Sequence, residues 1–296
     1  MAEKPDAKAK SAKTARSGGG IKPDIATIAG LCLALGGILG GLVLEKGSIQ
    51  DVAQVTAALI VFGGTFGAVL VTSPWPVFRR AMKSMRDVFL EQSTTTAATI
   101  QTLIGFATQA RKNGIVSLES EADKIADPFL RKALNLAVDG TDLNELRQIM
   151  EVDMQLAEQV GDEDAKVWEA AGGYSPTIGI IGAVMGLIQV MKHLDDIKEV
   201  GHGIAVAFVA TVYGVASANI LFLPAGGKLR ARNQRATLMK EMVLEGVTGI
   251  IEGLNPTLIR MKLTAFDLNP AAPKKAHEKN AKPDAKVASQ PAPARS

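Results

Sequence analysis

The sequence predicts an all-α integral membrane protein with four transmembrane helices, a helical cytoplasmic domain between the second and third, and both termini in the cytoplasm. Four segments lack Asp, Glu, Lys, Arg and His: residues 25–44, 52–71, 174–191 and 204–223. At about 1.5 Å per helical residue, each matches the ~30 Å hydrocarbon core of a bilayer. Composition agrees, because the chain is 47% hydrophobic but only 4% aromatic and holds 29 Gly among 296 residues. Such a composition suits helices packed closely in lipid.

The distribution of Lys and Arg predicts the orientation. Basic residues are frequent in the leader and directly after the second and fourth apolar segments, whereas the loop 45–51 has only Lys46. The loop 192–203 offsets its two Lys with three acidic residues. Because Lys and Arg accumulate on the cytoplasmic side, the two short loops are expected outside and the segment 72–173 inside.

The remaining elements follow in chain order. Residues 1–20 and 269–296 are rich in Ala, Lys and Pro or Gly and are expected to be a disordered basic leader and a disordered tail. Residues 21–71 hold transmembrane helices 1 and 2. Residues 72–173 are too long for a bare loop and form the cytoplasmic helical domain. Its pattern predicts one helix over 94–112 and another capped by Asp142 and Glu145. Residues 174–224 hold transmembrane helices 3 and 4, and residues 225–268 form C-terminal cytoplasmic helices, with a break at Asn255-Pro256.

Several function classes are disfavoured. One Cys, Cys32, excludes an intrachain disulfide, and three scattered His argue against a zinc site. A net charge of +3, with the basic excess at the termini and beside the apolar segments, argues against nucleic-acid binding. The chain has no nucleophile elbow, phosphate loop or HExxH motif. We therefore expect no enzymatic activity, no cofactor and no resident metal.

The apolar segments carry small residues at helical spacing but no ionisable side chain. Gly-x-x-x-Gly pairs begin at Gly36, Gly37, Gly63 and Gly182, which favours close approach of helix backbones. Gradient-driven ion carriers usually bind the ion at an intramembrane ionisable group. Either the protein moves no ions, or a partner helix supplies that group to spans three and four, whose polar residues could also serve only helix packing. Pro176 and Pro224 frame these two spans, as helix punctuation or as points of bending.

Four separated motifs resemble the MotA/PomA family of flagellar stator proteins. They are Ala110-Arg-Lys-Asn-Gly-Ile-Val-Ser-Leu-Glu119, Ser175-Pro-Thr-Ile-Gly-Ile-Ile-Gly-Ala-Val-Met-Gly186, Thr211-Val-Tyr-Gly214 with Asn219 and Pro224, and Gly246-Val-Thr-Gly-Ile-Ile-Glu-Gly-Leu-Asn-Pro256. The resemblance covers residues 22–268. It implies a homo-pentamer around two copies of a single-span, peptidoglycan-binding MotB or PomB partner in the inner membrane. That partner would bring the intramembrane Asp, and ion flow would turn the ring against the rotor protein FliG.

The same resemblance assigns roles to individual positions. Arg111, Lys112 and Glu119 match the family's rotor-binding charges, although the acids that follow in some members are replaced by Ser120-Glu121-Ala122. Pro176 and Pro224 match its functional prolines and so become conformational hinges. Ala183 and Thr211 match positions of the ion path. Sodium-type members carry Thr where this chain has Ala183, which favours protons over sodium.

Three other interpretations stay open at this point. A sodium-driven, PomA-like stator would share Thr211. A TolQ/ExbB-type energiser of an outer-membrane process would resemble the last two spans, but such proteins typically have three spans and an external N-terminus. A passive membrane scaffold would account for the small-residue faces and not for the collected motifs.

Overall fold

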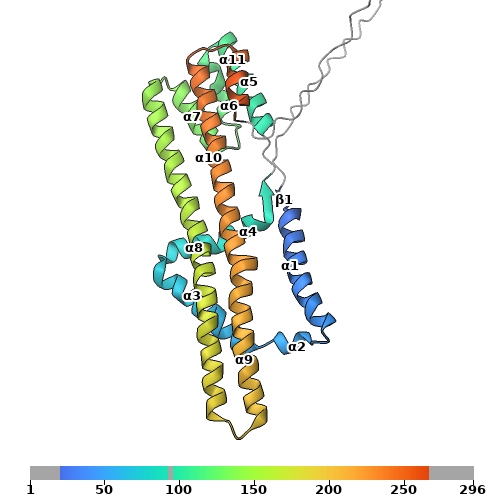
Figure 1. The fold of residues 1–296 in the computed structure, drawn as a ribbon. Coiled ribbons are helices and arrows are strands. Elements are labelled where there is room, and N and C mark those ends of the chain that lie inside the picture. The colour runs from blue at the N-terminus through green and yellow to red at the C-terminus, as the bar shows by residue number, and fades with distance from the viewer. Residues whose placement is uncertain (1–20, 93–95, 267–296) are drawn as a thin grey trace, which may run out of the picture.

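The computed structural model describes residues 21–92 and 96–266. The expected disordered segments 1–20 and 269–296 lie outside these residues. Within the described part, four helices are long and apolar enough to cross a membrane. Figure 1 shows an elongated molecule built on two long helical columns that run side by side, with a bundle of short helices at one end.

The N-terminal third contains the first two spans and an amphipathic helix. The chain runs through β1 (Ile21–Pro23), α1 (Ile25–Leu44), α2 (Ile49–Val52), α3 (Val55–Thr72), α4 (Trp75–Phe89) and β2 (Leu90–Gln92). The second span was predicted over 52–71 and begins instead at Val55, because the chain breaks between α2 and α3. β1 and β2 pair antiparallel, so the all-α prediction misses one short two-stranded ladder.

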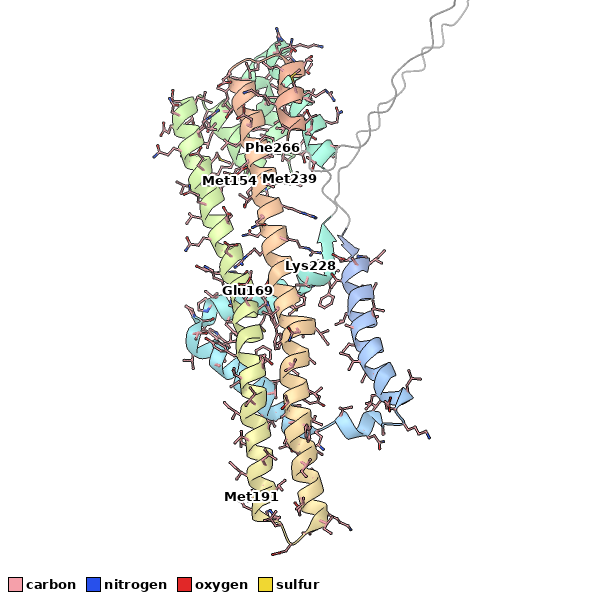
Figure 2. All side chains as sticks on the ribbon, viewed as in Figure 1. Met154, Glu169, Met191, Lys228, Met239 and Phe266 are labelled. Carbon is pink, nitrogen blue, oxygen red and sulfur yellow. The ribbon has the colours of Figure 1, made fainter. Side chains whose placement is uncertain are left out.

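The distal helical domain is the bundle of short helices together with the ends of the two columns. It contains α5 (Thr96–Asn113), η1 (Ile115–Leu118), α6 (Glu119–Ala122), α7 (Pro128–Val138) and α11 (Pro256–Thr264). Its own apolar core joins these helices to both columns, through residues that include Leu103, Leu134, Leu146, Met150, Met242 and Ile259. Figure 2 labels Met154 and Met239 beside this core, with Met191 at the opposite end of the molecule.

Both columns pass from the distal helical domain into the apolar spans. The first column is α8 (Leu143–Lys192), a single helix of 50 residues. The second is α9 (Ile197–Ala216), the π-helical segment η2 (Ser217–Phe222) and α10 (Leu223–Ile251), which together make a run of 55 residues. The predicted cap of α8 is confirmed at Asp142, which accepts a hydrogen bond from the Asn144 amide, whereas Glu145 lies in the first turn and forms no hydrogen bond back to Asp142 within the described residues.

This continuity corrects two predictions about the prolines. Pro176 was placed near the start of a separate third span, where a missing N–H has no partner to lose. It lies instead in the interior of α8, so the carbonyl four residues earlier loses its helical donor. The C-terminal cytoplasmic helices were predicted from residue 225, but α10 begins at Leu223 and continues the fourth span, so Pro224 also lies within the second column. Neither proline ends a helix, and the interpretation as helix punctuation is wrong.

The first span stands apart from the others. No residue of α1 is buried, and a Cβ on Gly36, Gly37, Gly40 or Gly41 would meet nothing within 4 Å. Figure 1 shows α1 joined to the rest at its ends only, through α2 at one end and the β1–β2 ladder at the other. The predicted close packing of these Gly faces therefore does not occur within the chain.

Candidate functional site

The centre of the molecule is a seam of small residues between α8 and α9. A Cβ built on Gly179 would lie 2.9 Å from the Ala210 carbonyl oxygen, and one on Gly214 would lie 2.6 Å from the Ser175 carbonyl oxygen. A Cβ on Gly186 would lie 2.7 Å from the Gly203 carbonyl oxygen. Only residues without a side chain allow the two backbones to approach so closely, as the Gly182-x-x-x-Gly186 spacing predicts.

The two predicted ion-path residues lie on the two helices of this seam. Ala183 follows Gly182, whose added Cβ would meet the Ala210 methyl at 2.8 Å, and Thr211 follows Ala210. Both side chains are half-buried. The Thr211 hydroxyl donates to the Ala207 carbonyl at 3.2 Å, so it satisfies its own helix and leaves its lone pairs for a second partner.

Pro176 lies beside a polar contact that crosses the seam. The hydroxyls of Ser175 and Ser217 are 2.7 Å apart, and Ser217 also donates to the Tyr213 carbonyl at 2.6 Å. Ser175 is fully buried. The weakened turn of α8 is therefore tied sideways to the first residue of the π-helical segment, and a bend in either helix must change the distance between these hydroxyls.

Pro224 lies just beyond the π-helical segment. Its ring would crowd the carbonyl of residue 220 in a regular helix, and it lacks the N–H that this carbonyl would accept. The wider η2 segment, Ser217–Phe222, covers that position and relieves the conflict without ending the column. Each predicted hinge residue therefore stands at a local defect in an otherwise continuous column.

A half-buried tyrosine, Tyr213, ties the middle of the fourth span to the break between α2 and α3. The Tyr213 hydroxyl donates to the Val52 carbonyl at 2.5 Å and accepts from the Gln54 amide at 3.3 Å. These bonds satisfy backbone groups left open at the break between α2 and α3. They also tie α9 to the start of the second span.

A cluster of charges closes the gap between α1 and the second column at the end nearer the distal helical domain. Asp24 caps α1 by accepting from the Thr27 amide and binds the side chains of Lys228 and Arg232. Arg232 also donates to the Leu90 carbonyl at 2.6 Å. The hydrogen bond from Lys228, supported by the Thr27 amide, holds the pKa of the Asp24 carboxyl well below its ordinary value. Figure 2 shows Lys228 on the side of α10 that faces α1.

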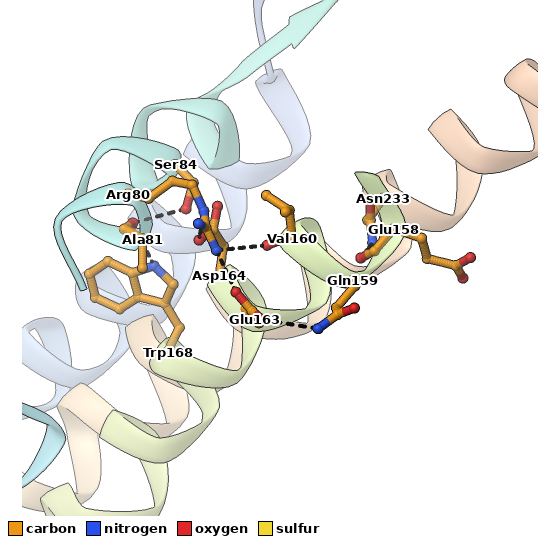
Figure 3. Close-up of polar contacts among 10 residues, drawn as sticks. All are labelled: Arg80, Ala81, Ser84, Glu158, Gln159, Val160, Glu163, Asp164, Trp168 and Asn233. Atoms are coloured by element: carbon orange, nitrogen blue, oxygen red, sulfur yellow. Dashed lines mark hydrogen bonds and ion pairs between the residues drawn. The ribbon is translucent and has the colours of Figure 1, made fainter. Parts of the chain in front are cut away.

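A second charged cluster fixes α4 against α8 (Figure 3). Arg80 donates to Asp164 at 2.7 Å and to Glu163 at 2.9 Å, and Trp168 donates its indole N–H to the Ala81 carbonyl at 3.0 Å. In the sequence, Arg80 is one of several basic residues after the second apolar segment, and nothing there pairs it with Asp164. The two residues are about eighty positions apart, so no local pattern predicts their contact.

The predicted rotor-binding charges lie in the distal helical domain, on α5 and α6. Arg111 and Lys112 are in the last turn of α5, where cations complement the helix dipole, and Glu119 begins α6. Gly114, with φ of +81°, turns the chain between them. All three side chains are exposed, and none forms an ion pair with any residue of 21–92 or 96–266.

Arg111 also lies at the edge of a cavity. This cavity of about 380 Å³ is lined mainly by apolar groups of α5, α7 and the turn between α10 and α11, including Ala107, Ile115 and Leu254. The Gln109 side chain donates to the Ser117 carbonyl at 3.0 Å and holds the turn closed. The charges are thus presented from a packed edge and not from a free loop.

The parts of the chain that are described hold no cluster of three or more His, Cys, Asp or Glu able to bind a metal ion. These parts combine close contacts between α8 and α9, two prolines within the long columns, and the exposed charges Arg111, Lys112 and Glu119.

The fold and these features define a multi-pass membrane protein of the proton-channel type. Residues 121–242 match the MotA/TolQ/ExbB proton channel family, and residues 28–114 match the Motility protein A N-terminal family. Motility protein A of Helicobacter pylori is 35% identical over 252 residues, which cover 85% of this chain and 98% of that protein. The protein of the same name from Bacillus subtilis is 32% identical and covers 82% of this chain and 90% of its own length. The chain belongs to the motility protein A family.

Solved structures agree with this assignment. The structure of Campylobacter jejuni MotAB matches with a TM-score of 0.80 at 34% sequence identity, over 84% of this chain and 98% of that one. The flagellar MotAB stator complex from Bacillus subtilis matches with a TM-score of 0.75 at 33% identity, over 81% of this chain and 94% of that one. The resemblance seen in the four sequence motifs is confirmed.

Proposed function

We propose that the chain is the ion-conducting stator subunit of a bacterial flagellar motor and acts with a MotB-like single-span partner. The observation that carries this proposal is the α8–α9 seam, which is close-packed and whose apolar segments 174–191 and 204–223 contain no ionisable side chain. A carboxylate from the partner would then serve as the site at which an ion stops between the two faces of the membrane. The similarity to two MotAB complexes supports this partner.

The two long columns would bend at Pro176 and Pro224. One elementary charge crossing 100 mV releases about 2.3 kcal/mol. That energy suits a bend at a turn already missing a helical hydrogen bond, and not the opening of a packed helix bundle. Protonation of the partner carboxylate would alter the charge beside the seam and change the distance across the Ser175–Ser217 contact.

Because the columns are continuous, a bend near the seam would move the distal helical domain. α8 and α10 each run from the seam region to the core of the distal helical domain, where Leu146, Met150 and Met242 are fully buried. A tilt at Pro176 or Pro224 therefore moves the domain as one body, and with it Arg111, Lys112 and Glu119. These charges would engage the rotor protein FliG on the cytoplasmic side.

The transported ion is the proton in this proposal. Of the two ion-path positions, only Thr211 carries a side-chain oxygen that could bind a dehydrated sodium ion, because Ala183 offers none. A proton needs only the carboxylate and water. Exchange of Na⁺ for K⁺ in the swimming medium tests the choice, since a sodium-driven stator would stop.

The assembly proposed is a pentamer around a MotB dimer in the inner membrane, with both termini in the cytoplasm. The isolated position of α1, with its Gly face uncovered, supports contacts between copies of the chain. No enzymatic role is assigned. Cross-linking of the purified complex, followed by measurement of the molecular mass of the cross-linked species, tests the number of subunits.

Deletion of the gene tests the function directly. Cells that still build flagellar filaments but do not swim, and that recover with the wild-type gene, would identify a stator. Cells without filaments would point to an assembly role. Swimming cells with a leaky outer membrane would indicate an energiser of the TolQ/ExbB type, the other branch of the family matched by residues 121–242. If swimming continues unimpaired, a second stator set could replace the deleted one. A double deletion tests this, and cells that still swim would refute the proposed function.

A further inference from the structure

α4 is an amphipathic helix with two different charged faces. At about 100° per residue, the side chains of Trp75, Arg79, Lys83 and Arg86 fall within an arc of about 80°. All four are exposed, and Trp75 is 64% exposed. Buried Ala81 and Val88 lie on the opposite side of the helix.

The buried side of α4 is fixed to the body of the protein. Ala81 accepts the Trp168 indole N–H at 3.0 Å, and Arg80 is neutralised by Asp164 and Glu163 (Figure 3). The helix therefore cannot roll, and the orientation of its exposed cations is set by the packing of α8.

The three cations on this face of α4 are exposed. Within residues 21–92 and 96–266, neither Arg79, Lys83 nor Arg86 forms a hydrogen bond or an ion pair with a side chain. The only carboxylate of α4 is Asp87, which is exposed one turn beyond Lys83. The face is thus an unpaired basic stripe with an aromatic residue at one end.

The position of α4 places this stripe at a membrane surface. α3 ends at Thr72, only two residues before α4 begins, and its last turns expose Leu70 and Val71. Figure 1 shows α4 running across the two columns, so it lies roughly in the plane of the bilayer that α3 crosses. Trp75 stacks on Phe78 with ring centroids 5.9 Å apart, an aromatic pair at the depth where such rings favour the interface.

We propose that the stripe Trp75–Arg79–Lys83–Arg86 is a binding surface for the headgroups of anionic phospholipids. Paired cations such as Arg80 contribute little to such binding, whereas each unpaired cation near an anionic surface favours it about fivefold. The site is independent of torque generation and requires only that α3 crosses the membrane.

Fluorescence quenching tests the site, since Trp75 and Trp168 are the two tryptophans of the chain. The full chain with its partner is placed in phosphatidylcholine vesicles. Phosphatidylglycerol or phosphatidylcholine, brominated near the carboxyl end of the acyl chains, is then added in increasing fraction. A Trp75→Phe variant supplies the background, including buried Trp168. Brominated phosphatidylglycerol should quench Trp75 at a fraction at least about fivefold lower than brominated phosphatidylcholine.

Matched variants assign that preference to the stripe. The triple change Arg79→Gln, Lys83→Gln and Arg86→Gln keeps good helix formers and should remove the preference. The equal change of charge in Arg235→Gln, Lys240→Gln and Arg260→Gln, on α10 and α11, should leave it intact. The wild-type preference should also fall in 1 M salt, which screens exposed charges and tests the site even where the triple variant fails to assemble.

Three outcomes overturn the proposal. The first is equal quenching of wild-type Trp75 by the two brominated lipids. The second is a preference that survives the triple variant. The third is a Trp75 that neither brominated lipid nor aqueous iodide can quench, which would show that protein, and not lipid, covers the stripe.

Discussion

The closest backbone approach in the seam allows a sharp test at Gly214. Replacement by Ala adds a Cβ that would lie 2.6 Å from the Ser175 carbonyl oxygen and 3.0 Å from the Gly179 Cα. Both are backbone atoms, so no side chain can rotate away and the two helices must separate by about 0.8 Å or more to reach an ordinary contact. Overpacking of this kind lowers the free energy of unfolding by about 1–3 kcal/mol. The better helix propensity of Ala offsets up to ~1 kcal/mol of that loss.

The expected result is a stator that is present but impaired. We expect Gly214→Ala cells to swim slowly or not at all, with the protein retained in the membrane at a reduced Tm in detergent, because the Ser175–Ser217 contact lies at the same level. Gly201→Ala is the matched control, since it lies on the same helix and its Cβ would meet nothing within 4 Å. Swimming speed, immunoblots of membranes and thermal unfolding of the purified complex measure the effect. Wild-type speed and Tm in Gly214→Ala would refute the close-packed seam.

Three further predictions concern the charges and the hinge. Arg111→Glu or Glu119→Arg should reduce swimming without changing the amount of protein in the membrane, because both side chains are exposed and support no internal contact; loss of the protein from membranes would contradict this. Pro176→Ala returns a helical N–H to α8 and should stiffen the column, so that cells stop swimming while the complex still forms; swimming at normal speed would remove the hinge role. Asp24→Asn should lower the stability of the purified protein by about 1–3 kcal/mol, through loss of charge-assisted bonds to Lys228 and Arg232. Because the pKa of Asp24 is lowered on folding, this contribution is present at neutral pH and is lost only as the pH falls below the ordinary carboxyl range; a Tm difference between wild type and variant that grows toward low pH would contradict the assignment.

Features that depend on neighbouring residues could be predicted from the sequence. Four spans could be read from local hydropathy, since each must satisfy its own backbone in lipid and present apolar side chains all round. The cap at Asp142 and the turn at Gly114 follow from short-range hydrogen bonding and from backbone freedom at glycine. The predicted rotor-binding positions came from resemblance alone, and the structure shows only that their side chains are exposed.

How these parts connect depends on contacts between residues that are far apart in the sequence. Pro176 suggests a helix boundary, yet α8 passes through it, because one lost hydrogen bond is offset by packing along the whole column. Partners such as Arg80 with Asp164, or Asp24 with Lys228, are separated by 84 and 204 residues, and no local pattern pairs them. Likewise, Gly36 and Gly182 begin equivalent Gly-x-x-x-Gly spacings, but only the second meets another helix in the chain. Spacing shows that a face can pack closely, and only the fold shows which helix packs against it.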